Sequence, residues 1–340
     1  MSTLEVFATG PLTTIQDGGR PGLASLGVSR SGAADRRSRS LANRLLSNPE
    51  DAATLEVTLV GLSLRATDEV WLAVTGADVD VLVDHGSGPR PVGMNAPFVV
   101  HAGGSVTLGM ARAGLRAYVA VRGGIAAEST LGSCSTDTLS GLGPAPLTAG
   151  DRLARRVGPD ARGAAGASAA RPTAAGAPAS EEAGVVMVGD PETSLRPMPA
   201  PGQVAVLRVV PGPRDDWFGE AGLERLFTQD WDVSQQTDRI GVRLTAPDGG
   251  APLERVRAGE LKSEGAVRGA LQVPPSGEPV LFLSDHPVTG GYPVIGVVAR
   301  ADLSLAAQLP PGTRVRFVPH PRPGAETVVD SASPSEETPA

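Results

Sequence analysis

The stretch Val280–Val298, which reads VLFLSDHPVTGGYPVIGVV, consists of two apolar runs on either side of a turn that is rich in glycine and polar residues. The runs Val280–Leu283 and Val294–Val298 have the length and the β-branched composition of strands. The segment therefore predicts a strand, a tight turn and a second strand.

The same rhythm of short strands and turn residues extends through both halves of the chain. Besides the two runs above, we expect strands within residues 4–7, 71–74, 79–83, 98–100, 106–108, 118–121 and 204–210. Helices are expected only at Ala33–Leu46, where apolar residues repeat at i,i+4, and near Glu220–Phe227. The sequence predicts a mainly β protein with a few helices, folded as barrels or sandwiches.

Changes in composition divide the chain into four parts. Residues 161–184 are almost only Ala, Gly, Ser, Pro and Arg, with no large apolar side chain to bury. Such a stretch cannot offset the entropy cost of ordering, so we assign residues 158–202 to a linker or insertion. Residues 320–340 have a similar composition and are assigned to a disordered tail. Two folded lobes remain, residues 3–157 and 203–319.

Composition excludes several classes of function. A net charge of −7 disfavours nucleic acid as the partner, and no apolar run is long enough for a membrane helix. Cys134 is the only cysteine and no secretory signal is evident, so we expect a cytoplasmic protein. The four histidines lack metal-ligand spacing, and no metal site is predicted. Lys262, the only lysine, does not follow a glycine, which excludes a Walker-type ATP loop.

The turn at residues 285–292 is the first candidate site. Gly290 and Gly291 alone would satisfy a tight turn between two strands. Asp285, Thr289 and Tyr292 add more polar groups than a turn requires, which favours a small-molecule site.

Glycine-rich loops elsewhere supply further candidate residues. Asp17 and Arg20 lie in a loop with three glycines and could orient a polar ligand, although Asp17 could equally stabilise its own turn. Ser31 is placed to cap the first helix or to bind an anion there. Asp238 beside Arg239 could form a structural ion pair or a clamp for a carboxylate.

Ten motifs, in order, resemble the subunit-2 component of the allophanate-hydrolase and urea-amidolyase group, also called biotin-dependent carboxyltransferases. This family includes the C component of 5-oxoprolinase and the regulator KipA. The motifs are TTIQDGGRPG (13–22), GVSRSGAAD (27–35), TLEVTLVG (54–61), TGAD (75–78), RGGI (122–125), PGPRDDWF (211–218), TDRIGVRL (237–244), SEG (263–265), QVPPSGEP (272–279) and TGGYP (289–293).

The resemblance implies two cyclophilin-like β-barrel lobes and a heteromeric complex. The implied partners are a KipI-like protein, which is the B component of such complexes, and a lactam-utilisation-type protein. The implied reaction is the ATP-dependent opening of 5-oxoproline to L-glutamate, with ATP used by the complex, directly or through a partner, and no covalently bound cofactor. Two alternatives stay open: a biotin-dependent carboxyltransferase acting on urea or a related small amide, and a KipA-like non-catalytic regulator.

We assign roles to the candidate residues on this basis. Asp285 is expected to bind or deprotonate the substrate amide, with Asp17 and Arg20 as further catalytic groups from the first lobe. The substrate-binding residues are expected to be Ser31, Arg239, Gln272, Thr289, Gly290 and Tyr292. Backbone donors and carboxylates of this kind suit the recognition of an amide and the stabilisation of an imidate-like oxygen.

Overall fold

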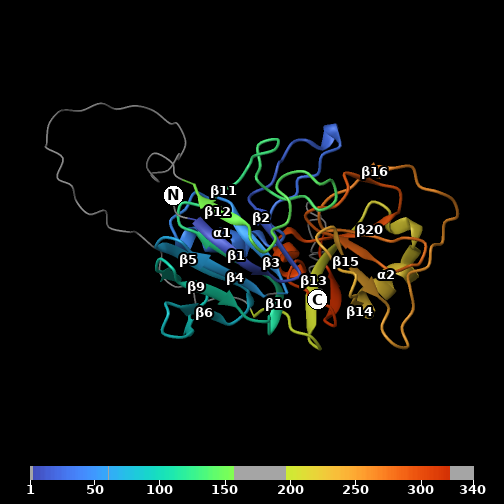
Figure 1. Ribbon diagram of the computed structural model, residues 1–340. Helices are drawn as coiled ribbons and strands as arrows, with labels where there is room; N and C mark the ends of the chain where they lie inside the picture. The colour runs from blue at the N-terminus through green and yellow to red at the C-terminus, as the bar shows by residue number, and fades with distance from the viewer. Residues whose placement is uncertain (1–2, 60, 157–196, 322–340) are drawn as a thin grey trace, which may run out of the picture.

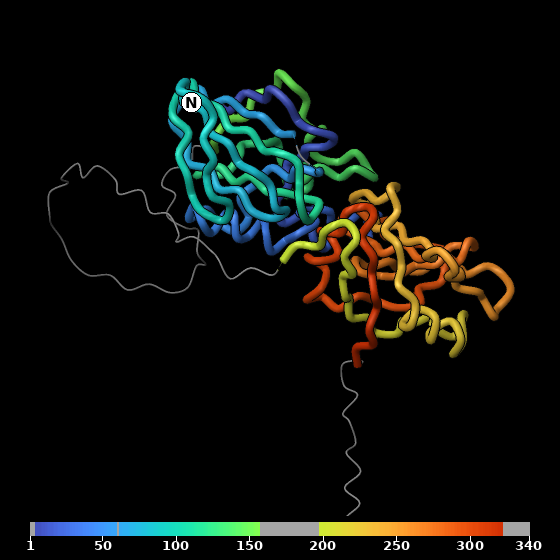
Figure 2. The backbone as a smooth tube through the Cα atoms, turned by 90° about the horizontal axis from the view of Figure 1, so that it is seen from below, coloured from blue at the N-terminus to red at the C-terminus, as the bar shows by residue number. Residues whose placement is uncertain are grey.

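Two β-rich lobes lie side by side, as the computed structural model shows for residues 3–59, 61–156 and 197–321 (Figure 1). The first lobe, blue to green, precedes the second, yellow to red, and the view from below separates them clearly (Figure 2). The prediction of a mainly β fold with few helices is confirmed. Most of the predicted linker and of the predicted tail lies outside the described residues.

The first lobe is built from two antiparallel sheets. The seven-stranded sheet has the order β11-β12-β1-β4-β9-β6-β7 and the five-stranded sheet the order β2-β3-β10-β5-β8. The strands are β1 (Thr3–Thr9), β2 (Leu12–Gln16), β3 (Thr54–Thr58), β4 (Leu62–Ala66), β5 (Val70–Asp78), β6 (Val81–Asp84), β7 (Arg90–Val92), β8 (Pro97–Val100), β9 (Ser105–Leu108), β10 (Ala113–Val121), β11 (Ile125–Ala126) and β12 (Arg152–Arg155).

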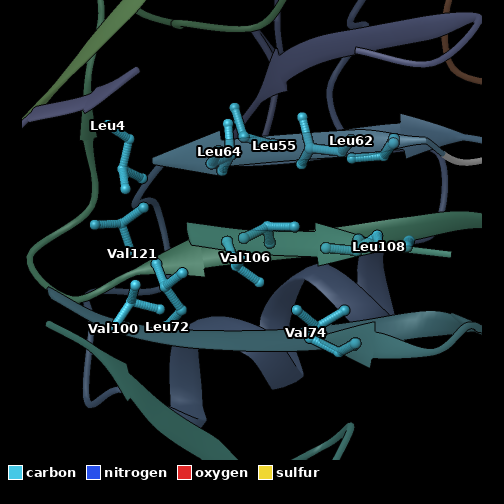
Figure 3. Packing of buried hydrophobic residues seen from close by; sticks show 14 of the residues in the cluster. Leu4, Leu55, Leu62, Leu64, Leu72, Val74, Val100, Val106, Leu108 and Val121 are labelled. Atoms are coloured by element: carbon cyan, nitrogen blue, oxygen red, sulfur yellow. The ribbon is translucent and has the colours of Figure 1, made fainter. Parts of the chain in front are cut away.

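Leucine and valine side chains from both sheets form the core of the first lobe. Figure 3 shows side chains of β4 and β9, such as Leu64 and Val106, facing those of β5, such as Leu72 and Val74. All four are fully or almost fully buried. Alternation along each strand directs these residues inward, as the period of two requires.

The second lobe is a closed barrel with the strand order β13-β20-β17-β18-β15-β14-β21. Its strands are β13 (Val204–Pro211), β14 (Asp230–Val233), β15 (Gly241–Thr245), β17 (Ala270–Gln272), β18 (Val280–Phe282), β20 (Val294–Val298) and β21 (Arg314–Pro319). β13 and β21 run parallel, and the other neighbours run antiparallel. A separate two-stranded ribbon pairs β16 (Glu264–Gly265) with β19 (Thr289–Gly290).

Three α-helices occur in the described part of the chain: α1 (Arg36–Leu45), α2 (Gly219–Thr228) and α3 (Leu303–Ala306). Short 3₁₀ turns are η1 (Ala24–Leu26), η2 (Asp215–Trp217) and η3 (Arg300–Asp302). Helix α1 packs on β5 and β10 through Leu41 and Leu45, which lie on one face four residues apart.

The start of α1 differs from the sequence-based expectation. Asp35 is the N-cap, and its carboxylate accepts hydrogen bonds from the backbone N–H groups of Arg37 and Ser38. Ser31, which we expected as a possible cap, lies four residues earlier with a positive φ of 52°. Its hydroxyl is aimed at the second lobe instead, where it donates to Asp285.

Candidate functional site

Asp285 lies fully buried at the junction between the lobes, with no solvent exposure. Its carboxylate accepts a hydrogen bond from the Ser31 hydroxyl at 2.6 Å and two from Thr138, from N–H at 2.9 Å and from the hydroxyl at 2.8 Å. Arg239 adds a two-pronged ion pair through Nε at 2.8 Å and Nη2 at 2.9 Å. Both carboxylate oxygens are therefore fully occupied by protein donors.

Arg239 joins this carboxylate to the first lobe. Its guanidinium also donates to the Glu56 carboxylate and, at 2.8 Å, to the carbonyl of Gly32. Glu56 in turn accepts from the Tyr118 hydroxyl at 2.8 Å and from the Ala34 N–H at 2.8 Å. Burial by itself would lower the pKa of Arg239, but Glu56 and then Asp285 outweigh it and raise that pKa. Arg239 does not pair with the adjacent Asp238, whose carboxylate accepts from the N–H groups of Ile240 and Gly241. Its guanidinium is instead a buried link between the lobes rather than an exposed clamp.

A second set of buried contacts locks the same junction. The Gln308 carbonyl oxygen accepts from the N–H groups of Leu115 and Arg116, both at 2.9 Å, and its amide nitrogen donates to Asp35 at 2.9 Å. Arg116 donates to the carbonyls of Ala307 and, at 2.9 Å, Asp238. Buried polar groups that are satisfied across an interface in this way fix one relative placement of the two lobes.

These contacts bear on the role that we expected of Asp285. Burial alone would raise the pKa of its carboxyl, but Arg239 and the hydrogen bonds from Ser31 and Thr138 lower it. The ionised carboxylate has no exposed oxygen, and it holds Ser31, Thr138 and Arg239 in place. In this geometry Asp285 acts as a positioning residue in one buried network with Ser31 and Arg239, and its catalytic role stays a prediction.

Asp17 and Arg20 lie in a neighbouring cluster and do not contact Asp285 in the described part of the chain. The Asp17 carboxylate accepts from the hydroxyls of Ser133 and Ser135, both at 2.6 Å, and from the Cys134 N–H at 2.7 Å. Arg20 donates to the Ser135 carbonyl at 2.6 Å. The hydrogen bonds lower the pKa of Asp17 although burial opposes them. Both side chains are buried and hold the 130–138 loop in place, so neither is placed for catalysis.

The 130–138 loop connects the Asp17 cluster with the buried network around Asp285. Its serines bind Asp17, whereas Thr138 at its other end binds Asp285. Asp17 and Cys134 also line a separate cavity of about 320 Å³. Burial, and then Asp17, raises the pKa of the Cys134 thiol, so the thiol is not activated as a nucleophile.

Gln272 and Tyr292 lie in a third place, beside the ribbon β16–β19. The Gln272 amide donates to the Tyr292 carbonyl at 3.3 Å, and both residues line a small cavity of about 70 Å³ together with Gly290. Thr289 pairs with Gly265 in the ribbon, is exposed and does not line this cavity. The predicted site residues thus fall into three separate groups rather than one pocket.

A cleft of about 1020 Å³ lies between the lobes, and we call it the inter-lobe cleft. Its polar lining residues are Ser29, Arg30, Arg36 and Arg37 from the first lobe and Arg268, Ser284, His286, Arg300 and Ser304 from the second. Ser284 and His286 flank Asp285, which places the buried network directly behind this wall of the cleft. Ala266 and Val267 line both this cleft and the small cavity beside Gln272.

His286 is the cleft residue with the properties of a proton acceptor. Its Nδ1 lies 2.7 Å from the Pro287 carbonyl, which can only accept, so Nδ1 carries the proton and Nε2 keeps its lone pair. The ring stacks on Phe282, with ring centroids 5.8 Å apart. Burial lowers the pKa of His286, and the nearby Arg268 lowers it further. The imidazole is therefore neutral near pH 7, as a general base must be.

Sequence reasoning missed most of this arrangement. A charged residue within an otherwise apolar strand, such as Glu56 or Arg116, was a usable signal, because such residues are almost never buried without a partner. The arginines of the cleft come from residues 30–37 and, more than 200 residues later in the chain, from Arg268 and Arg300, and no local sequence pattern joins these two regions.

Comparison with known proteins gives one family. Residues 26–319 match the carboxyltransferase domain, subdomain A and B. The chain is 32% identical to the C component of 5-oxoprolinase from Escherichia coli (strain K12), over 93% of this chain and 90% of that protein. It is 30% identical to the urea amidolyase of Saccharomyces cerevisiae, over 94% of this chain but only 17% of that protein.

Solved structures show the same relationship. The structure of TTHA0988 superposes with a TM-score of 0.75 at 30% identity, covering 94% of this chain and 55% of that chain. The Kluyveromyces lactis urea amidolyase superposes with a TM-score of 0.76 at 28% identity, covering 93% of this chain and 18% of that one. The chain thus spans about half of TTHA0988 and less than a fifth of the urea amidolyase.

Proposed function

The chain belongs to the family of carboxyltransferase domains with subdomains A and B, and we propose that it is one component of an ATP-dependent 5-oxoprolinase. In this proposal the complex opens 5-oxoproline, a small cyclic amide, to L-glutamate. The chain works with a KipI-like B component and a lactam-utilisation-type protein in the cytoplasm. ATP is consumed by the complex, and this chain carries no covalent cofactor.

Coverage of the relatives carries the proposal. The chain matches 90% of the length of the Escherichia coli 5-oxoprolinase C component and 87% of its Haemophilus influenzae counterpart. The fungal urea amidolyases are matched over only 17% or 18% of their length. A match over about nine-tenths of the C components supports the role of that component more than the role of one part of a urea amidolyase.

In the proposed reaction, water adds across the lactam C–N bond. The oxygen of water bonds to the ring carbonyl carbon, the C–N bond breaks and the nitrogen leaves as the amine of glutamate. His286 is suited to accept the proton from the attacking water and to return it to the leaving nitrogen, because its Nε2 keeps its lone pair and its ring is neutral. Ser29 and Ser284 also line the inter-lobe cleft. Their hydroxyls donate to Asp137 and to the Ala33 carbonyl, so toward an amide N–H they are suited to act only as acceptors.

A biotin-dependent carboxyltransferase that acts on urea or a related small amide is the second candidate. The alignment to urea amidolyases over more than nine-tenths of this chain favours it, as does the similar fold. In that reaction the amide nitrogen would bond to the carboxyl carbon that biotin carries, and the bond from that carbon to the biotin nitrogen would break. His286 would accept the amide proton, and the released biotin nitrogen would take up a proton.

Reconstitution separates the candidates. The full chain is co-purified with the KipI-like protein and the lactam-utilisation protein, and glutamate and ADP release from 5-oxoproline are followed. We expect both products only when all three proteins and ATP are present. Glutamate formation that is equal without this chain refutes the proposal. Carboxylation of urea by the chain with carboxybiotin supports the second candidate, and a stable complex without turnover of either substrate supports a KipA-like regulator.

A further inference from the structure

We propose that the inter-lobe cleft is a binding site for a small molecule that carries a phosphate group. Five arginines line it: Arg30, Arg36, Arg37, Arg268 and Arg300. No aspartate or glutamate is among the described residues that line the cleft. This concentration of positive charge contrasts with the chain as a whole, whose net charge is −7.

Two of these arginines have donors without a protein acceptor. The Nε of Arg36 and the Nε of Arg268 are both buried and have no hydrogen-bond partner in the described structure. Arg268 is held in place by another of its nitrogens, which donates to the Ala34 carbonyl. Unpaired buried donors are costly, and an oxygen of a bound anion could accept from each of these two.

The guanidinium groups also repel one another. Burial lowers the pKa of Arg36 to about 9, and Arg268, Arg30 and Arg300 contribute to the lowering. Burial is the largest cause of this lowering, and repulsion from the neighbouring guanidinium groups adds to it. A bound anion would offset that repulsion.

Helix α1 contributes to the positive charge at the inter-lobe cleft. Its first turn contains Arg36 and Arg37 and no acidic residue, although the N-terminal end of a helix dipole is itself positive. The Asp35 carboxylate already caps this helix end, where it accepts from the N–H groups of Arg37 and Ser38. The positive charge left for a ligand therefore comes from the guanidinium groups of Arg36 and Arg37 rather than from the helix dipole.

A phosphate group fits this lining better than a carboxylate does. A carboxylate is planar, carries one negative charge and is typically matched by one guanidinium fork. The five arginines come from the loop before α1, from α1, from the segment after β16 and from η3, so they surround the cleft from several directions. A phosphate carries up to two charges on tetrahedrally arranged oxygens, and it can accept from several arginines together.

The size of the cleft indicates that phosphate is part of a larger molecule. A volume of about 1020 Å³ is at the upper end of the range for small-ligand and cofactor sites, and it exceeds what a free ion fills. The ligand class is thus a phosphate ester or a polyphosphate, such as a nucleotide. Phosphate binding here does not depend on the 5-oxoprolinase reaction, because it follows from the cleft alone.

Binding to the full chain tests the proposal. Inorganic phosphate, pyrophosphate, ATP, acetate and 5-oxoproline are each added at matched ionic strength, and Tm and calorimetric Kd are measured. We expect pyrophosphate and ATP to raise Tm most, inorganic phosphate less and acetate not at all. Stronger binding of ATP than of pyrophosphate would show that the ligand is a nucleotide. Equal binding of the two would show that the cleft recognises only the phosphate groups. Binding of 5-oxoproline with no binding of any phosphate compound overturns the proposal and leaves the proposed function intact.

Variants supply the decisive comparison. Arg36→Gln should weaken pyrophosphate binding tenfold or more while the Tm of the unliganded chain stays constant or rises, because a repelled charge is removed. Arg300→Gln, at an exposed position, provides a second variant in case the first is misfolded. Arg112→Gln is the control, because Arg112 pairs with Asp78 and Asp80 on the surface and does not line the cleft. Unchanged pyrophosphate affinity in both cleft variants refutes the proposal.

Discussion

Asp285→Asn is the substitution that most sharply tests the buried network between the lobes. It keeps the shape of the side chain and removes its charge. In the wild-type chain the carboxylate accepts two hydrogen bonds from Arg239, two from Thr138 and one from Ser31. An amide nitrogen at one of these oxygen positions would face donors rather than accept from them, so at least one strong hydrogen bond is lost.

The size of the expected loss in the free energy of unfolding follows from the burial of this ion pair. Removing one partner of a buried ion pair costs about 3–5 kcal/mol, and Arg239 retains Glu56, so we expect a loss near the lower end, about 3 kcal/mol. With a slope of about 3 kcal/mol per M urea, the unfolding midpoint moves down by about 1 M. Far-UV circular dichroism of the purified full chain in urea measures this shift.

Asp230→Asn is the matched control. Asp230 also accepts a two-pronged ion pair from an arginine, Arg316, at 2.7 and 3.0 Å. That pair lies on the surface, where the arginine side chain is 52% exposed, and such pairs contribute about 0–1 kcal/mol. Equal midpoint shifts in the two variants would refute the reasoning, because burial would then have no bearing on the cost.

The pH dependence gives a second readout of the same variant. The pKa of Asp285 is lowered in the folded chain, so the folded state binds a proton less readily than the unfolded state does. Its contribution to stability is therefore present above the ordinary carboxyl pKa of about 3.9 and is lost as pH falls through the lower folded value. Asp285→Asn should lose less stability than the wild type when pH is lowered from 5 to 3.

Three further changes test the cleft, a tight loop and the Gln272 group. For the reconstituted complex, kcat/KM should fall as pH drops through a pKa below 6.5, because protonation of His286 removes its lone pair. His286→Gln should lower kcat by about 10²–10⁴-fold and should abolish this fall of kcat/KM at low pH. Gly19→Ala should lower Tm more than Gly22→Ala does. Both glycines have a positive φ, so the backbone strain is similar. A Cβ at Gly19 would meet facing carbonyl oxygens at 2.4 and 2.8 Å, whereas a Cβ at Gly22 would meet nothing within 4 Å. An equal loss of Tm would show that the facing loop yields. Gly290→Ala places a Cβ 2.4 Å from the Gln272 amide nitrogen in the small cavity outside the inter-lobe cleft, so it should leave the KM for 5-oxoproline unchanged. A raised KM would instead place Gln272 in the substrate site.

Local sequence patterns were sufficient for the β-rich fold class and for several of its elements. The runs at 280–283 and 294–298 are largely β18 and β20, and helix α1 lies within the predicted 33–46 segment. These elements depend on periodicity and on turn residues within one short window. Short strands such as β7 and β11 carry too few residues for such a pattern to form.

The arrangement of polar residues was beyond local patterns. Asp285 was singled out correctly as an unusual polar residue, but its neighbours Ser31 and Thr138 are 254 and 147 residues away in the chain. Whether a carboxylate faces a ligand or a buried guanidinium depends on such long-range contacts. His286, next to it, has the free nitrogen and faces the cleft, yet its position alone did not distinguish it from three other histidines.

A crystal structure of the full chain with 5-oxoproline, alone or in complex with its KipI-like partner, tests most directly whether the inter-lobe cleft is the reaction site. We predict that the lactam is bound in that cleft, with its amide or carbonyl within hydrogen-bond reach of His286 and Ser284, and that Asp285 keeps its bonds to Arg239. A lactam bound in the cavity beside Gln272, or on the partner alone with the cleft unoccupied, would contradict this prediction.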